Sequence, residues 1–498
     1  MRQRFFEYHR VLQACIKHPG EQRIELQMVV ITFVFVIAML NSFIGIGAVA
    51  ILVFGYRGAW LPMAHYFFER HGKLFSIYVP MAGFLTVAAS IGPIARDDLL
   101  RDIIVGQYYQ YDYRNLYPIS TLPSFDLWYG FDHALNWFQI ALTPIVTMWL
   151  LQFLLYSSMT AVVAKAVLQI MGDRRDRIYW AGLAVAVAVY LSVGRIGLAR
   201  PEIILSVWAI SAILVRRNSG VVAWTLAGAV LCTSYWLAFL YFAAALLFQT
   251  NVTKKIGAAI ALTVIHFGFW LLMFGADYYS ALLWLPDVLQ KQICEVGENL
   301  GLELLLFNPV VIGLLILGSI GLVVDGTRRA LTIAFVLVFF IASNQVRYIG
   351  VIAPLMVLLA IQCWKPKLPE LNAMGMPLVA CISLFLLLQV AGTIPSRDDA
   401  PNFAIPVNSR VITAFGEATY AMPFFNPGIQ IEPSYAFGAA PKDVQQLSLD
   451  ISRNTKINCE TIKKYHFTHV VEQSMSGEPP SCLTLSAVQK KWRLWNVQ

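Results

Sequence analysis

The sequence predicts a polytopic α-helical membrane protein with a small mixed α/β domain at its C-terminal end. Apolar residues make up 58% of the 498-residue chain and charged residues only 13%, about half the charged fraction of a soluble domain. Long apolar runs alternate with short clusters of arginine and lysine, as membrane spans alternate with cytoplasmic loops. The polar composition of the last hundred or so residues is compatible with a small soluble domain.

The basic residues set the expected topology. The net charge of +8 does not indicate nucleic-acid binding, because the basic residues gather between apolar runs. We expect 1–27, which is basic and lacks the apolar core of a signal peptide, to be cytoplasmic. Residues 28–395 then form the transmembrane part, within which 28–73 either crosses once or enters and returns. The outer loop 95–133 and the tail 396–498 face the periplasm of a bacterial inner membrane.

An acidic pair begins the outer loop. Asp97 and Asp98 follow the run 74–94, which is 21 residues long and contains no charged side chain. A run of that length spans a bilayer as a helix, so both carboxylates emerge at the membrane surface. Charges there often only fix the end of a helix, but carboxylates near a membrane are also a functional signal. Asp97 and Asp98 are our candidate catalytic residues, and the sequence does not choose between them.

The same loop combines carboxylates with aromatic rings. It contains six aspartates and a dense series of tyrosine and tryptophan residues. An aromatic belt at the membrane surface explains the rings, but not the aspartates. Sugars suit the mixture, because their apolar faces stack on aromatic rings and a carboxylate can deprotonate an acceptor hydroxyl. The candidate sugar- or acceptor-binding residues of the loop are Tyr111, Asp112, Tyr113, Trp128, Asp132 and His133.

Three arginines lie in predicted outer loops, against the positive-inside trend. Arg195 and Arg200 precede Glu202 between two apolar runs, and Arg347 precedes Tyr348. Phosphate binding would explain them; pairing with nearby carboxylates explains the first two equally well, and a lone arginine such as Arg347 is more often a membrane anchor. The three arginines are our candidate donor-phosphate ligands, with Glu202 and Tyr348 as further sugar- or acceptor-binding residues.

The tail carries its own signals. Alternating apolar residues at 468–472 and 492–497 predict two strands. Cys459 and Cys482 lie together in this polar segment, and they are the expected disulfide if it faces an oxidising compartment. His466 and His469 lack a third ligand, so no metal site is expected there.

The motifs resemble those of the GT-C superfamily of integral-membrane glycosyltransferases. The resemblance lies in their order along the chain and in their expected position on the same side of the membrane. Arg96-Asp97-Asp98 matches the acidic motif of its first outer loop, and Arg200-Pro201-Glu202 is similar to an Arg-x-acid motif at the outer end of a middle helix. The segment from Arg347-Tyr348 to Pro354 is similar to a late Arg-Tyr motif, although Ile352 replaces its first proline. The chain departs from the family in having an apolar run, 28–54, before the acidic loop.

The resemblance implies the reaction and the partners. A sugar would pass, with inversion, from a polyprenyl-phosphate carrier to an extracytoplasmic glycan, lipid or pilin. Asp97 or Asp98 would be the base, and Arg195, Arg200 and Arg347 would hold the phosphate. A fainter resemblance is to the bacterial enzymes that attach arabinofuranose to type IV pilins. No cofactor is certain, although an aspartate pair can bind a divalent metal.

Other classes remain open on the sequence alone. An O-antigen ligase or polymerase would also present outward arginines but would use a pyrophosphate-linked donor. A transporter or flippase for lipid-linked sugars would place charges near the middle of its helices. A membrane scaffold leaves the carboxylate-rich loop unexplained. The sequence contains no P-loop and no GxGxxG motif, so nucleotide binding has no support.

Overall fold

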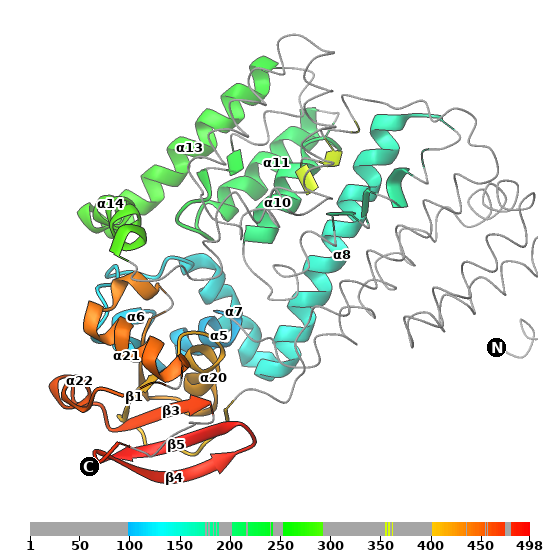
Figure 1. Ribbon diagram of the computed structural model, residues 1–498. Helices are drawn as coiled ribbons and strands as arrows, with labels where there is room; N and C mark the ends of the chain where they lie inside the picture. The colour runs from blue at the N-terminus through cyan, green and yellow to red at the C-terminus, as the bar shows by residue number, and fades with distance from the viewer. Residues whose placement is uncertain are drawn as a thin grey trace, which may run out of the picture.

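The computed structural model describes residues 98–174, 202–215, 218–239, 241–242, 252–291, 401–434, 436–453, 455, 457–473 and 480–498, with scattered helical positions in 177–188 and 354–361. A layer of short helices lies between a C-terminal sheet domain and a group of longer helices (Figure 1). The short helices come from the acidic segment of the sequence. The layer therefore joins the two larger parts of the described molecule.

The acidic segment is helical rather than a loop. It forms α5 (Asp98–Tyr108), α6 (Tyr113–Leu116) and α7 (Tyr129–Ala141). Asp112 caps α6 by accepting a hydrogen bond from the Arg114 backbone N–H at 2.9 Å. Between α5 and α6 the chain turns through Gln110 and Tyr111, whose φ angles of 55° and 58° are uncommon outside glycine. Extended loop residues are thus confined to the connections between these helices.

The longer helices follow in chain order. They are α8 (Pro144–Met171), α10 (Glu202–Ser211), α11 (Asn218–Leu231), α13 (Val252–Phe274) and α14 (Ala276–Lys291). Thr143 caps α8, and Gly275, with a φ of 55°, separates α13 from α14. A glycine takes that left-handed conformation without steric cost.

The prediction of a polytopic membrane bundle is wrong for the part of the chain that the structure describes. Two of its helices are long and apolar enough to cross a membrane, over Leu150–Met171 and Gly257–Phe274. Helices α10 and α11 have 10 and 14 residues, fewer than the about 20 that a span needs. Most apolar residues of α10 are instead buried within the protein. Apolar sequence here builds a protein core as well as candidate spans.

The two candidate spans differ in their surroundings. In α13 only 22% of the apolar window is buried within the protein, against 44% in α8. The exposed side chains of α13 are large and aliphatic: Ile260, Val264, Ile265, Leu271, Leu272 and Met273. Contiguous apolar exposure of this kind marks a surface for lipid or for another protein.

The tail forms a mixed five-stranded sheet with the order β2-β1-β3-β5-β4. The strands are β1 (Arg410–Thr413), β2 (Gln430–Glu432), β3 (His469–Gln473), β4 (Leu483–Gln489) and β5 (Trp492–Val497). Strand β1 runs parallel to β2 and β3, whereas β5 is antiparallel to β3 and β4. The two strands expected from the alternation, β3 and β5, are confirmed.

Helices complete the C-terminal domain. They are α20 (Glu417–Phe425), α21 (Lys442–Arg453) and α22 (Cys459–Lys464), with the 3₁₀ turn η5 (Phe437–Ala439). The buried face of α21 carries Val444, Leu447 and Ile451, which share a core with Ile412 and Val470 of the sheet. Because these apolar residues recur at helical spacing, α21 presents one apolar face to the strands.

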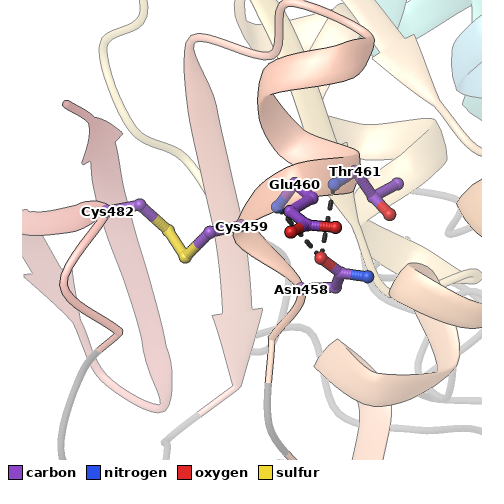
Figure 2. Close-up of a disulfide and its surroundings, with 5 residues drawn as sticks. All are labelled: Asn458, Cys459, Glu460, Thr461 and Cys482. Carbon is purple, nitrogen blue, oxygen red and sulfur yellow. Dashed lines mark hydrogen bonds between the residues drawn. A yellow bond between two sulfur atoms is a disulfide. The ribbon is translucent and has the colours of Figure 1, made fainter.

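A disulfide joins Cys459 to Cys482, as expected from the sequence. It links the start of α22 to the residue before β4, and Asn458 caps α22 beside it by accepting from the backbone N–H groups of Glu460 and Thr461 (Figure 2). The disulfide therefore ties the start of α22 to the start of β4.

Candidate functional site

A fully buried arginine lies at the centre of the acidic segment. Nη2 and Nε of Arg101 donate to Oδ1 of Asp102 at 2.9 and 3.2 Å, and both side chains are at most 2% exposed. The guanidinium group lies over the rings of Tyr113, Trp128 and Tyr420, at 5.0, 5.4 and 5.8 Å from their centroids. Burying a charge is costly without such partners. Arg101 therefore fixes α5 against α6, against the start of α7 and against the C-terminal domain.

Tyr113 connects this ion pair to a second carboxyl group. Its hydroxyl lies 3.1 Å from Oδ1 of Asp102 and 2.9 Å from Oδ2 of Asp132. The hydroxyl has one proton, so it cannot donate fully to two ionised carboxylates at once. The contact is least repulsive when one of the two aspartates is uncharged, with its proton on the oxygen that faces away from Tyr113. Because Arg101 neutralises Asp102, Asp132 is the group that holds the proton.

Asp126 and Asp132 are neighbours in this interior, and each carboxyl group affects the pKa of the other. Each is 1% exposed, and neither Oδ2 of Asp126 nor Oδ1 of Asp132 receives a donor from another described residue. A proton held between the two carboxyl groups satisfies both oxygens. Burial raises the pKa of both groups, and the neighbouring charges of Asp126 and Asp102 raise the pKa of Asp132 further. The pair therefore keeps a proton at pH values where an exposed aspartate has lost it.

An aromatic stack adjoins the acid pair. The rings of Tyr111 and His133 are stacked at 3.8 Å, and Tyr129 packs on His133 at 4.1 Å. Asn136 donates to the Tyr111 hydroxyl at 2.8 Å. A Cβ atom at Gly106 would lie 2.7 Å from the Tyr111 ring, so glycine permits this close approach. The stack covers one face of Tyr111 and leaves the residue half-buried.

The predicted sugar-binding residues thus separate into three groups. Tyr113, Trp128 and Asp132 belong to the buried network around Arg101, where the two rings enclose the guanidinium group. Tyr111 and His133 form the stack at its edge. Asp112 instead pairs with Arg114 at 2.7 Å on the outside. The structure therefore brings five of these six residues of the segment into one region.

The remaining predicted residues lie apart from the network or outside the described residues. Glu202 begins α10 and is buried, and its Oε2 has no hydrogen-bond donor among the residues that the structure describes. Asp98 begins α5 one helical turn before Asp102, but its side chain lies outside the description. The other residues outside the description are Asp97, Arg195, Arg200, Arg347 and Tyr348.

The C-terminal domain supports the acidic segment through a buried carboxyl group. Glu432 at the end of β2 accepts hydrogen bonds from the backbone N–H groups of Ile119 and Ser120 and from the Ser120 hydroxyl, at 2.8, 3.1 and 2.6 Å. Burial raises the pKa of Glu432 to about 7, although these hydrogen bonds act in the opposite direction. The Tyr109 hydroxyl donates to the Ile429 carbonyl at 2.7 Å. The acidic segment and the domain thus form a joint core.

Two members of the network were not selected from the sequence. Asp102 and Asp126 are two of the six aspartates in the predicted loop, yet nothing in their spacing separates them from the others. One local signal existed for Asp126, because it stands two residues before Trp128 and accepts the Trp128 N–H at 2.8 Å. This is an Asx-turn. Asp102 has no comparable local signal, since its position depends on the packing of α5 against α7.

No group of three or more histidine, cysteine, aspartate or glutamate side chains is placed to hold a metal ion within the described ranges. Asp102 and Asp132 of the network accept hydrogen bonds from Arg101 and Tyr113 instead. The chain matches no family model and no curated protein sequence.

Proposed function

We propose that this protein is a glycosyltransferase that moves a sugar from a polyprenyl-phosphate carrier to an acceptor outside the cytoplasm, with inversion. The observation that carries this proposal is the way in which α5 is held in place. Asp98 begins that helix, and the next turn is fixed by the buried pair of Arg101 and Asp102. A reactive group needs a rigid mount of this kind if it is to meet its substrate in a productive geometry.

The location that we propose, a bacterial inner membrane with the C-terminal domain in the periplasm, suits a lipid-linked donor. The disulfide between Cys459 and Cys482 is the product of an oxidising compartment, which for a bacterial inner-membrane protein is the periplasm. Two helices are long and apolar enough to hold the protein in that membrane. Sugar nucleotides are made in the cytoplasm, whereas a polyprenyl-phosphate carrier delivers an activated sugar to the outer surface.

The reaction needs no further reagent. The acceptor hydroxyl oxygen forms a bond to the anomeric carbon, and the bond between that carbon and the phosphate oxygen breaks, with its electron pair going to the phosphate. The hydroxyl proton passes to Asp97 or Asp98 as general base. Arg195, Arg200 and Arg347 are the proposed ligands of the phosphate, whose negative charge grows as the sugar leaves.

The buried network is assigned to positioning and not to contact with substrate. Asp126 and Asp132 are each 1% exposed, so an acceptor does not reach them in this conformation. The proton that they share reduces the negative charge of the network that packs against α5. An ionised pair would otherwise add to the charge around Asp98 and disfavour the binding of an anionic donor.

The test is transfer by the purified full chain in nanodiscs, with a radiolabelled polyprenyl-phosphate sugar and a glycan or pilin acceptor. Asp97→Asn and Asp98→Asn are made separately, and we expect one of them to reduce transfer by about 10²–10⁴-fold without loss of donor binding. Asp173→Asn is the control, because that carboxylate is exposed and distant in sequence from the acidic segment. Full transfer by both aspartate variants would remove these residues as the base. Use of a pyrophosphate-linked oligosaccharide in preference to the monophosphate donor would favour the ligase class.

A further inference from the structure

Helix α7 carries the buried Asp132 on one side and an exposed apolar face on the other. Phe131, Asp132 and Leu135 are buried. Ala134, Trp137, Phe138 and Ala141, which recur at the spacing of one helical face, are exposed. Trp137 is 75% exposed, and Ile140 next to this face is 80% exposed. Trp137 and Ile140 thus have little protein around them.

The chain next to this face indicates what covers it. Only Leu142 and Thr143 separate α7 from α8, which contains the candidate span Leu150–Met171. Val146 and Leu154 of α8 are also exposed, so the apolar surface continues from one helix to the other. No charged residue occurs in 134–164. If α8 crosses the bilayer, the end of α7 lies at the boundary between headgroups and acyl chains.

We propose that the exposed face of α7 docks on the outer surface of the lipid bilayer. Tryptophan is enriched at that depth, because its ring is amphipathic, and a helix with one apolar face binds by burying that face below the headgroups. The occupant is lipid, and a second copy of the chain is the competing occupant that the test distinguishes. The proposal rests on the membrane placement in the proposed function but not on its chemistry.

The docking sets the height of the acid network above the membrane. Asp132 precedes Trp137 by five positions on the same helix, a rise of about 8 Å. The phosphate of a lipid-linked substrate lies at the level of the headgroups. Because α7 lies along the surface when this face is buried, Asp132 on its opposite side lies about one helix diameter, roughly 10 Å, from the acyl chains and near the level of that phosphate. This accounts for the neutral composition of α7 beyond His133, since charged residues would hold the helix away from the acyl chains.

Photocrosslinking of the full chain tests the inference. Trp137 or Ile140 is replaced by p-benzoylphenylalanine, and the protein is placed in liposomes of phosphatidylethanolamine and phosphatidylglycerol and irradiated. Val407 and Val488 serve as control positions, because they are apolar side chains of the C-terminal domain with exposures of 67% and 60%. Formation of the disulfide, read on a non-reducing gel, reports that each variant has folded.

We expect phospholipid adducts at positions 137 and 140, at least tenfold more abundant than at 407 and 488. Crosslinked dimers at 137 would assign the face to a second copy and overturn the inference. So would equal adduct yields at all four positions, or no adduct at 137 and 140. The crosslinking readout needs no sugar donor. Lipid adducts at 137 and 140 together with no transfer by the wild-type protein would therefore overturn the proposed chemistry alone.

Discussion

The hydroxyl oxygen of Tyr113 lies 2.9 Å from Oδ2 of Asp132, which ties α6 to α7 through a contact between two fully buried polar groups. The same oxygen lies 3.1 Å from Asp102. One proton thus connects carboxyl groups from two helices that are separated by 30 positions in sequence. The acidic layer is held by polar contacts as well as by apolar packing.

Removal of this hydroxyl should destabilise the protein. Tyr113→Phe keeps the ring over Arg101 but leaves the two carboxyl groups without their shared donor, and we expect a loss of about 1–3 kcal/mol in the free energy of unfolding. Thermal or urea unfolding in detergent measures the change. Tyr108→Phe is the matched control, because that ring is 52% exposed. Equal effects of the two variants would show that the bridging contact contributes nothing.

The pair of Asp126 and Asp132 should make stability depend on pH. The folded protein keeps a proton that the unfolded chain loses above a pKa of about 4, because burial raises the pKa of both groups. Unfolding therefore releases a proton, and stability falls by about 1.4 kcal/mol for each pH unit from about 4 upward until the folded pair itself loses the proton. Below pH 4 the pair contributes no slope.

Asp132→Asn separates this effect from other titrations. The amide donates to Asp126 in place of the shared proton, so the fold is retained and the slope from the pair is lost. The measurement is the melting temperature from pH 4 to pH 8 for both proteins. Parallel curves for the wild type and the variant would contradict a proton shared between Asp126 and Asp132.

Glu432 makes the joint core between the acidic segment and the C-terminal domain depend on pH in the same direction. Its pKa of about 7 lies above the ordinary value of 4.5, so its contribution to stability is complete below pH 4.5 and decreases as the pH rises to about 7. In Glu432→Gln the amide oxygen still accepts from Ile119 and Ser120, and the rotating Ser120 hydroxyl accepts from the amide nitrogen. Between pH 5 and pH 8 the stability of the variant relative to the wild type should rise by about 2.5 kcal/mol.

This difference isolates Glu432, because the Asp126–Asp132 pair contributes equally to both proteins. Differential scanning fluorimetry at each pH supplies the measurement. A constant difference across the range would mean that Glu432 stays ionised in the folded protein, or that the joint core opens before the carboxyl group titrates.

The sequence predicted the C-terminal domain better than the rest of the fold. Strands β3 and β5 are short runs rich in valine, leucine and tryptophan within a polar segment. The disulfide lies in the same segment, which contains two cysteines. The prediction of a polytopic bundle was wrong for the described residues because length and apolar composition do not distinguish a helix surrounded by lipid from one surrounded by protein. Ile203 and Leu205 of α10 are fully buried within the protein, although their run reads as a short span.

The candidate site shows a different limit. Sequence reasoning found the acidic segment, and Tyr113 and Asp132 do lie in its network. It did not find that Asp102 and Asp126 belong to the same network, because that depends on how α5, α6 and α7 cross. It also expected the rings of Tyr113 and Trp128 to be open to sugar, whereas both pack around Arg101. A buried arginine attracts aromatic faces in the same way that a sugar does, so composition alone cannot separate the two uses.

Loss of the disulfide between Cys459 and Cys482 should destabilise the C-terminal domain and report its compartment. The bond closes a connection of 23 positions, and replacement of both cysteines by serine should cost about 2–4 kcal/mol. Reductant should lower the melting temperature of the wild type by the same amount and leave the double variant unchanged. In cells, alkylation before and after reduction shows whether the bond forms during growth. Cysteines that are free in growing cells would place the domain in the cytoplasm and remove the case for a donor delivered outside it.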